Sequence, residues 1–268
     1  MLAAQRQKLI VDEIRREGGV RVSELTGLLA VSEMTIRRDI DVLAAAGLVE
    51  KVHGGATLRG GLSAEEPGFE AKSHRQLSEK EAISRAASRL VEPGQAIGLS
   101  AGTTTWRLAH HLADIPDLTV VTNSIQVADV LHRAARHDLT LVLTGGVRTP
   151  SDALVGPIAV NAIRSLHLDV LFLGVHGITA DAGLTTPNLL EAETDRALVA
   201  ASERLVVVAD HVKWGVRGLS RIAGLEDVDV FVSAPGLPAQ ARETIKEHVD
   251  RLVIAPKGQG AAARHGAA

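Results

Sequence analysis

The chain has 268 residues, of which 46% are apolar and only 2% aromatic, so its core must be built from Ala, Val, Leu and Ile. It contains no cysteine, which excludes disulfide bonds and thiolate metal sites. The net charge of −3, with nine Lys and Arg against eight Asp and Glu in the first 59 residues, excludes a protein that binds nucleic acid by general phosphate attraction.

No segment of the chain has the pattern of a targeting or membrane sequence. The N-terminal residues form no apolar stretch of the signal-peptide kind, and every apolar run is far shorter than the roughly 18–20 residues that a membrane helix needs. We therefore expect a cytoplasmic protein without a membrane partner.

Residues 1–57 predict three helices and a hairpin. Apolar residues recur at helical spacing until Gly18, Ser23 is an expected N-cap for a helix over 24–30, and Ser32 is an expected N-cap for a third helix. That third helix has a stripe of apolar residues formed by Ile36, Ile40 and Leu43. The alternating segment 48–52 predicts a strand, and the turn after it consists of His53, Gly54 and Gly55.

Two short helices followed by a hairpin are typical of a winged helix-turn-helix, in which the second helix of the pair enters the major groove of double-stranded DNA. The predicted DNA-binding residues lie at the start of that helix, on its exposed face and on the hairpin: Ser32, Thr35, Arg37, Arg38, Lys51 and His53. The pattern alone also allows a small helical domain whose arginines are merely solvated.

We expect a linker at 58–78, a larger α/β domain at 79–256 and a disordered, Gly- and Ala-rich tail at 257–268. In the larger domain, apolar runs alternate with helical stretches, which predicts a mostly parallel sheet covered on both faces. The expected strands are 96–99, 118–121, 139–143, 170–175, 205–209, 228–232 and 252–254.

Small and polar residues follow five successive strands, where a doubly wound sheet binds ligands. The loop at 100–105 leads directly into a helix, and its small residues and hydroxyls suit a phosphate at the helix N-terminus. Around this loop we expect the hydroxyls of a sugar. The predicted effector-binding residues are Gly102, Thr103, Thr104, Thr105, Asn123, Gly146, Asp152 and Lys213.

Segments 31–40 and 47–56 closely resemble the signature of the DeoR family of bacterial transcriptional regulators, which reads VS-x-x-TIRRDL, then a Gly-Leu pair, then R-x-HGGA. This chain departs mildly at Ile40 and Lys51, and it carries Trp214 where Phe is usual. Asp195 stands where many relatives have Lys, which leaves the role of that position open. The resemblance covers nearly the whole chain.

The resemblance implies a carbohydrate-metabolism repressor whose larger domain senses a phosphorylated sugar and is similar in fold to ribose-5-phosphate isomerase and the acyl-CoA transferases. Because one recognition helix covers only a few base pairs, we also expect a dimer or tetramer on repeated half-sites.

Three other functions are less consistent with the sequence. A sugar-phosphate isomerase needs a carboxylate base, for which Asp152, Glu191 and Asp210 are candidates, but such an enzyme has no use for a winged helix. A nucleotide-binding module is disfavoured because neither the G-x-x-x-x-G-K-[ST] nor the G-x-G-x-x-G pattern occurs. A metal site is disfavoured because His110 and His111 are adjacent on a predicted helix. We expect no catalytic residues, no metal and no cofactor.

Overall fold

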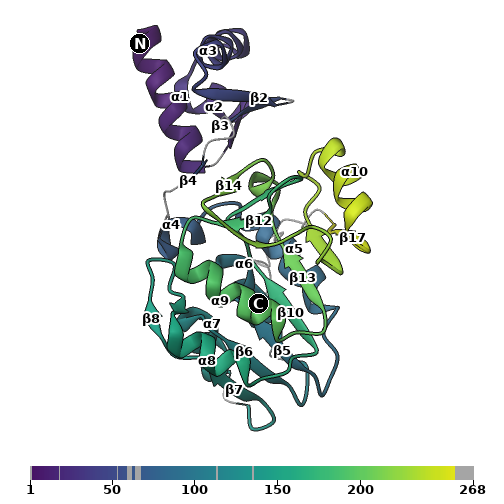
Figure 1. Ribbon diagram of the computed structural model, residues 1–268. Helices are drawn as coiled ribbons and strands as arrows, with labels where there is room; N and C mark the ends of the chain where they lie inside the picture. Colours follow the sequence, from purple (N-terminus) through teal and green to yellow (C-terminus); the bar gives the residue numbers. More distant parts are fainter. Residues whose placement is uncertain are drawn as a thin grey trace, which may run out of the picture.

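The computed structural model describes residues 2–17, 19–52, 54–58, 62–63, 68–112, 114–134 and 136–256, and it shows two units with separate hydrophobic cores (Figure 1). His53 and the predicted tail at 257–268 lie outside the described residues.

The N-terminal unit is the predicted winged helix-turn-helix. Its helices are α1 (Ala3–Glu17), α2 (Val22–Leu29) and α3 (Glu33–Ala45). Its antiparallel sheet has the order β1-β3-β2, with β1 at Gly19–Arg21, β2 at Val49–Val52 and β3 at Gly55–Leu58. Burial of the three helices and the sheet in one apolar cluster stabilises this unit, whose largest fully buried side chains are Ile10, Ile14, Leu25 and Ile36.

Two local predictions in this unit are wrong. Ser23 does not cap a helix, because α2 already begins at the buried Val22 and Arg21 takes the extended N-cap position. The backbone N–H of Arg21 donates to the Glu24 carboxylate at 3.0 Å. Gly55 is the first residue of β3 and not part of the turn, whereas Gly54 takes the left-handed conformation with φ +81°.

The larger unit is built on a seven-stranded sheet in which every neighbouring pair is parallel. Each strand falls within one of the predicted apolar runs or differs from it by one or two residues at an end. The strands are β5 (Ala96–Leu99), β6 (Thr119–Thr122), β7 (Thr140–Leu143), β10 (Val170–Leu173), β13 (Leu205–Val208), β16 (Val230–Ser233) and β17 (Arg251–Ile254).

Helices cover both faces of this sheet, and the strand residues alternate between the two resulting cores. Val170 and Phe172 pack with α5 (Leu77–Ser88), α6 (Thr103–His111) and α7 (Ile125–Arg133). Leu171 and Leu173 pack with α8 (Pro157–Arg164), α9 (Leu189–Ala200) and α10 (Ala239–His248). Within the described residues, no helix combines the length and apolar character needed to cross a membrane.

The sheet order β17-β16-β13-β10-β5-β6-β7 reverses direction between β5 and β10. From β5 the chain moves outward through β6 to β7, then returns to the other side of β5 and continues through β10 to β17. The loops that follow β5 and β10 therefore leave in opposite directions, which opens a crevice beyond the carboxyl ends of these two strands.

Short strands beside the main sheet were not predicted, because a strand of two to four residues is too short to show a periodic pattern. They form the ladders β8–β9, β11–β12–β15 and β14–β4. Their bounds are β4 (Leu62–Ser63), β8 (Val147–Arg148), β9 (Leu154–Val155), β11 (Gly177–Thr179), β12 (Gly183–Thr186), β14 (Arg217–Gly218) and β15 (Ser220–Ala223).

The predicted linker at 58–78 is not a linker throughout. Helix α4 (Phe69–Ser73) lies within it, and the ring of Phe69 packs edge-on against Trp106 of α6 with the ring centroids 5.6 Å apart. Helix α5 also begins within it, at Leu77. Gly60, Gly61, Pro67 and several charges make this segment resemble a linker, but the ring of Phe69, and its backbone N–H, which donates to the Pro150 carbonyl at 3.0 Å, hold α4 against the larger unit.

Candidate functional site

A pocket lies in the crevice at the carboxyl ends of β5 and β10. The loop after β5 supplies Gly102, Thr103 and Thr104, and the loop after β10 supplies Gly174, Val175 and His176. The remaining polar wall comes from α4, α5, α9, the β8–β9 hairpin and a short 3-10 helix, η1 (His211–Lys213): Lys72, Lys80, Ser151, Glu191, Asp195 and Lys213.

Hydrogen bonds fix the loop between β5 and α6. The Ser100 hydroxyl accepts from the backbone N–H of Gly174 at 3.0 Å, which joins the two loops of the crevice. The Asn123 side chain accepts from the backbone N–H of Ala101 at 2.9 Å. The first turn of α6, which begins at Thr103, therefore meets the pocket in a fixed position, and its N–H groups have no intrahelical acceptors. Such a helix start favours an anion.

Three lysines from three separate elements line the same pocket. Lys72 of α4 donates to the Ser151 hydroxyl at 2.8 Å, and Lys80 of α5 donates to the backbone carbonyl of Lys72 at 2.7 Å. Lys213 ends η1, whose N-cap is the Asp210 carboxylate. Together with the α6 N-terminus, these lysines add positive charge to the lining of the pocket.

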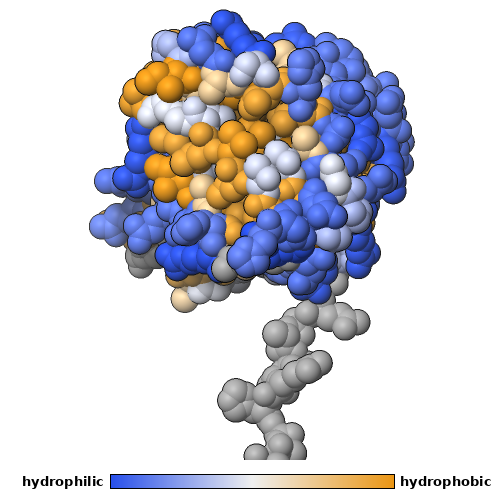
Figure 2. Space-filling view, turned by 90° about the horizontal axis from the view of Figure 1, so that it is seen from below, coloured by the Kyte–Doolittle hydropathy of each residue, from blue (hydrophilic) through white to orange (hydrophobic). Residues whose placement is uncertain are grey.

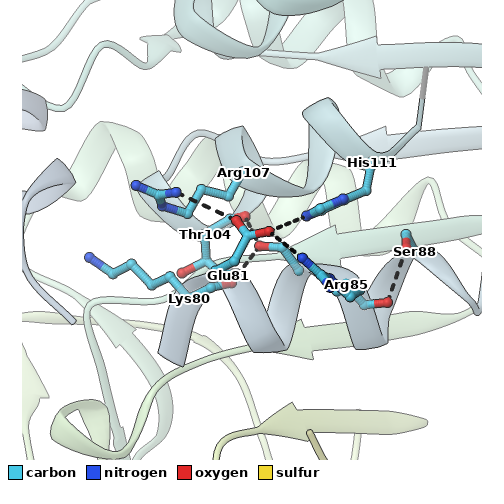
Figure 3. A network of polar contacts seen from close by, with 8 residues as sticks. Lys80, Glu81, Arg85, Ser88, Thr104, Arg107 and His111 are labelled. Atoms are coloured by element: carbon cyan, nitrogen blue, oxygen red, sulfur yellow. Dashed lines mark hydrogen bonds and ion pairs between the residues drawn. The ribbon is translucent and has the colours of Figure 1, made fainter. Parts of the chain in front are cut away.

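Lys80 is buried, with only 4% of its surface exposed. Burial lowers its pKa to about 8; the nearby Asp210 carboxylate opposes this change, and Lys213 and Arg107 add to it. Beside Lys80, the Glu81 carboxylate joins α5 to α6 through Arg107 at 3.5 Å and His111 at 3.0 Å. The Lys80 side chain extends away from the Glu81 carboxylate and His111, on the side of Arg107 (Figure 3).

Two carboxyl groups on α9 form another part of the wall. Glu191 accepts from the hydroxyls of Thr149 at 2.7 Å and Thr186 at 3.4 Å. Burial, and after it the charge of Glu191, raise the pKa of Asp195 well above its ordinary value. Among the described residues, no group of three or more His, Asp or Glu side chains could hold a metal ion.

The pocket contains four of the eight predicted effector-binding residues: Gly102, Thr103, Thr104 and Lys213. The other four support the walls. Thr105 is fully buried and donates to the Gly102 carbonyl at 3.0 Å, and Asn123 holds the β5 loop. A Cβ on Gly146 would lie 2.5 Å from the Val155 carbonyl oxygen, so this glycine allows β8 and β9 to approach. Asp152 accepts from Gln126 at 2.8 Å and from Arg148 at 2.7 Å.

Several pocket residues were missed because they precede β5 or lie far from the strand ends. Lys80 carried a usable signal, since it shares a helical face with Ile83, Ser84 and Ala87, all of which are buried. A lysine on the buried face of an amphipathic helix requires a partner or a ligand. Lys72 had no such signal, because α4 itself was assigned to the linker.

The candidate DNA-binding surface is the exposed face of α3. Ser32 caps the helix by accepting from the backbone N–H of Thr35 at 3.3 Å, and the two hydroxyls are 2.9 Å apart. The Arg37 side chain is 63% exposed and pairs with Glu33 at 3.5 Å. Arg38 is exposed and makes no ion pair within the described part of the chain.

On the opposite face of α3, the buried Asp39 accepts from Arg6 Nε at 2.5 Å and from Gln7 at 3.0 Å, which ties the helix to α1. On the hairpin, Lys51 of β2 is exposed and pairs with Asp41. The structure thus brings Ser32, Thr35, Arg37, Arg38 and Lys51 into one small unit, while His53 lies outside the described residues.

Comparisons with known proteins match both units. Residues 6–59 match the DeoR-like helix-turn-helix domain, and residues 75–234 match the DeoR C terminal sensor domain. A putative aga operon transcriptional repressor from Escherichia coli is 32% identical over 246 residues, 91% of each chain. The glycerol-3-phosphate regulon repressor of Escherichia coli is 31% identical over 256 residues, 95% of this chain and all of that one.

Among solved structures, ribose 5-phosphate isomerase A from Neisseria gonorrhoeae matches with a TM-score of 0.38 and 19% identity, over 53% of this chain and 54% of the other.

Proposed function

Because the chain belongs to the DeoR family of transcriptional regulators, we propose that it is a repressor of carbohydrate-metabolism genes whose operator binding is controlled by a phosphorylated sugar. Its relatives are named regulators and repressors, so the isomerase considered from the sequence is not supported and the chain is not an enzyme. Because its proposed partner is chromosomal operator DNA, the proposal places the chain in the cytoplasm.

We assign operator binding to α3. In this proposal, Ser32 and Thr35 at the start of the helix contact DNA phosphates, and Arg37 and Arg38 enter the major groove. The N-terminal unit has little excess positive charge, so a few well-placed cations must supply its affinity. Lys51, on the hairpin, is proposed to contact the DNA backbone.

The observation that carries the effector proposal is that the α6 N-terminus, Lys72, Lys80 and Lys213 line the same pocket. Backbone N–H groups and ammonium groups are the partners that proteins use for phosphate. The hydroxyl of Ser151 and the carboxyl groups of α9 lie in the same pocket and can bind sugar hydroxyls. Charge and hydrogen-bonding capacity together fit a sugar that carries one phosphate.

A thermal-shift screen tests this function with hexose and pentose phosphates, the corresponding free sugars and inorganic phosphate. A ligand at 100 times its Kd should stabilise the folded protein by about 2.7 kcal/mol. We expect a sugar phosphate to raise the melting temperature and to change operator affinity, and the free sugars to do neither. If no sugar phosphate had either effect, the effector assignment would be wrong.

We further propose that the protein is a dimer or tetramer. Figure 2 shows an extended hydrophobic face at the end of the molecule seen from below. On this side β7 is a free sheet edge, and exposed apolar side chains occur at Leu143 (46%), Val147 (64%) and Ile158 (67%). The Ile158 side chain is 3.5 Å from the position of a Cβ on Gly145, so α8 and the β7–β8 loop contribute to one surface. We assign this surface to a second copy of the chain, because large exposed apolar patches mark interfaces and repeated half-sites require paired recognition helices.

Light scattering on the Ile158→Glu variant tests the interface. We expect the variant to dissociate into smaller species, because a buried, unpaired carboxylate is costly at an apolar contact. The Leu219→Glu variant is the control, since Leu219 is 52% exposed but lies between β14 and β15. A wild-type monomer that still protects a single short DNA site would contradict the oligomer.

A further inference from the structure

The proposed effector pocket is lined by carboxyl groups as well as by lysines. Glu191 and Asp195 are four residues apart on α9, so they lie on the same helical face, and both line the pocket. Phosphate recognition by Lys72, Lys80 and Lys213 does not call for carboxylates. A second group on the ligand, a hydroxyl or an amine, can use them.

Glu191 is held in place as an acceptor. The hydroxyls of Thr149 and Thr186 each donate to one of its carboxylate oxygens, at 2.7 Å and 3.4 Å. Both threonines come from outside α9, from the segment between β8 and β9 and from β12. Hydrogen bonds of this kind favour the charged form of a carboxyl group and fix its direction.

Asp195 has no such support. The residue is 9% exposed, and within the part of the chain that the structure describes no hydrogen bond to its carboxyl group is formed. The neighbouring Arg196 is directed elsewhere, since its guanidinium donates to the Arg221 carbonyl at 2.5 Å. A buried carboxyl group beside another carboxylate either takes up a proton or pairs with a cation, and here the open side from which a cation can reach it is the pocket.

We propose that Glu191 and Asp195 bind a protonated amine, so that the effector is an amino sugar phosphate. This inference rests on the proposed function. The phosphate lies at the α6 N-terminus and the three lysines, and the amine lies at α9. A sugar hydroxyl in the same place would form hydrogen bonds but bring no charge, whereas an ammonium group forms charge-assisted hydrogen bonds with both carboxylates.

Isothermal titration calorimetry on the full chain tests this, with glucosamine and galactosamine 6-phosphates as probes against glucose and galactose 6-phosphates. We expect an amino sugar phosphate to bind at least about tenfold more tightly than its hydroxyl counterpart, a difference of about 1.4 kcal/mol.

In the Asp195→Asn variant, the ratio of the affinity for the amino sugar phosphate to that for its hydroxyl counterpart should fall toward one. Glu191→Gln should lower it as well, which covers the case in which one variant does not fold. Asp181→Asn is the matched control, since Asp181 is an exposed aspartate outside the pocket that pairs with Arg217; its ratio should equal that of the wild type.

The outcomes are distinguishable. Equal or tighter binding of the hydroxyl sugars would overturn the amine assignment and leave the proposed function intact, with Asp195 acting as a protonated donor to a sugar oxygen. An undiminished preference in both Asp195→Asn and Glu191→Gln would likewise overturn it. Failure of every sugar phosphate to bind would overturn the proposed function together with this inference.

Discussion

Arg37 and Arg38 are neighbours on the exposed side of α3, but their surroundings differ. Arg37 pairs with Glu33 one turn earlier, whereas Arg38 has no ion pair among the described residues. Arg37 must give up this contact to bind DNA, and an exposed pair of this kind is worth only about 0.3–0.5 kcal/mol. Both arginines are therefore available to DNA, and Arg38 has no ion pair to break among the described residues.

We expect Arg38→Ala to weaken operator binding by about 1–3 kcal/mol, the usual value for an arginine that reads a base. A fluorescence anisotropy titration with operator and random DNA measures it. Loss on the operator alone indicates base reading, and equal loss on both indicates a phosphate contact. Arg133→Ala, which removes an exposed arginine paired with Asp129, should change neither affinity. If Arg37→Ala and Arg38→Ala both bind like the wild type, α3 is not the recognition helix.

Lys80 gives the pocket a pH dependence. Burial lowers its pKa to about 8 in the free protein; the charge of Asp210 opposes this change, and those of Lys213, Arg107 and Arg75 add to it. A bound phosphate favours the protonated lysine, so its pKa must rise in the complex. Affinity for a sugar phosphate should therefore be highest below pH 8 and fall as the pH rises above it.

Calorimetry between pH 7 and pH 9.5 on the wild type and on Lys80→Arg checks this prediction. Arginine stays protonated over the whole range, so the affinity of the variant for a sugar phosphate should fall much less than that of the wild type as the pH rises. An equally steep decline in both proteins would assign the titration to another group.

The glycine at the start of β3 shows how closely this strand packs against β1. A Cβ on Gly55 would lie 2.0 Å from the Val20 carbonyl oxygen, far closer than a carbon can approach an oxygen to which it is not bonded, so β1 and β3 would have to separate. Gly27 in α2 is exposed, and nothing lies within 4 Å of the position of its Cβ. These two glycines provide a matched pair.

Gly55→Ala should lower the free energy of unfolding of the N-terminal unit by about 1–3 kcal/mol, as an overpacked site does. Gly27→Ala should raise it, because Ala is favoured over Gly inside a helix by about 0.8–1.0 kcal/mol. Urea denaturation of the full chain, followed by circular dichroism, measures both. A neutral Gly55→Ala variant would contradict the close approach of β1 and β3.

Strong periodicity made the larger elements predictable from the sequence. The seven strands of the main sheet are continuous apolar runs, and Ile36, Ile40 and Leu43 mark the buried face of α3. The pocket was only half predictable, since strand ends indicated Thr104 and Lys213 but not the elements that come from elsewhere to complete it. Helix α4 is five residues long, too short for a period to be seen, and its position depends on a contact between Phe69 and Trp106 that no local pattern encodes.

For the whole molecule, the proposed control of operator binding requires two sites that influence each other. The DNA-binding surface and the effector pocket lie in units with separate cores, so each can be altered without unfolding the other. Coupling between such sites is typically about 1–3 kcal/mol and is reciprocal. A change that destroyed both activities together would instead indicate unfolding.

Lys213→Ala should abolish the response to the effector and leave effector-free operator binding nearly unchanged. Arg38→Ala should do the reverse and still bind the sugar phosphate. Parallel titrations of each variant with DNA and with sugar phosphate give all four affinities. A Lys213→Ala protein that still responds at the wild-type effector concentration would remove Lys213 from the pocket.

The ladder between β4 and β14 bears on how such regulators diversify. It pairs Leu62 with Arg217 and Ser63 with Gly218, and so joins the segment beyond the hairpin to the larger unit. Arg217 comes only four residues after the pocket residue Lys213. Main-chain pairing depends little on side-chain identity, so it tolerates changes of sequence on either side. Recombination just before residue 62 would therefore exchange one operator specificity for another and keep the same attachment to the sensor. Chimaeras of relatives made at this point should inherit their operator from one parent and their effector from the other.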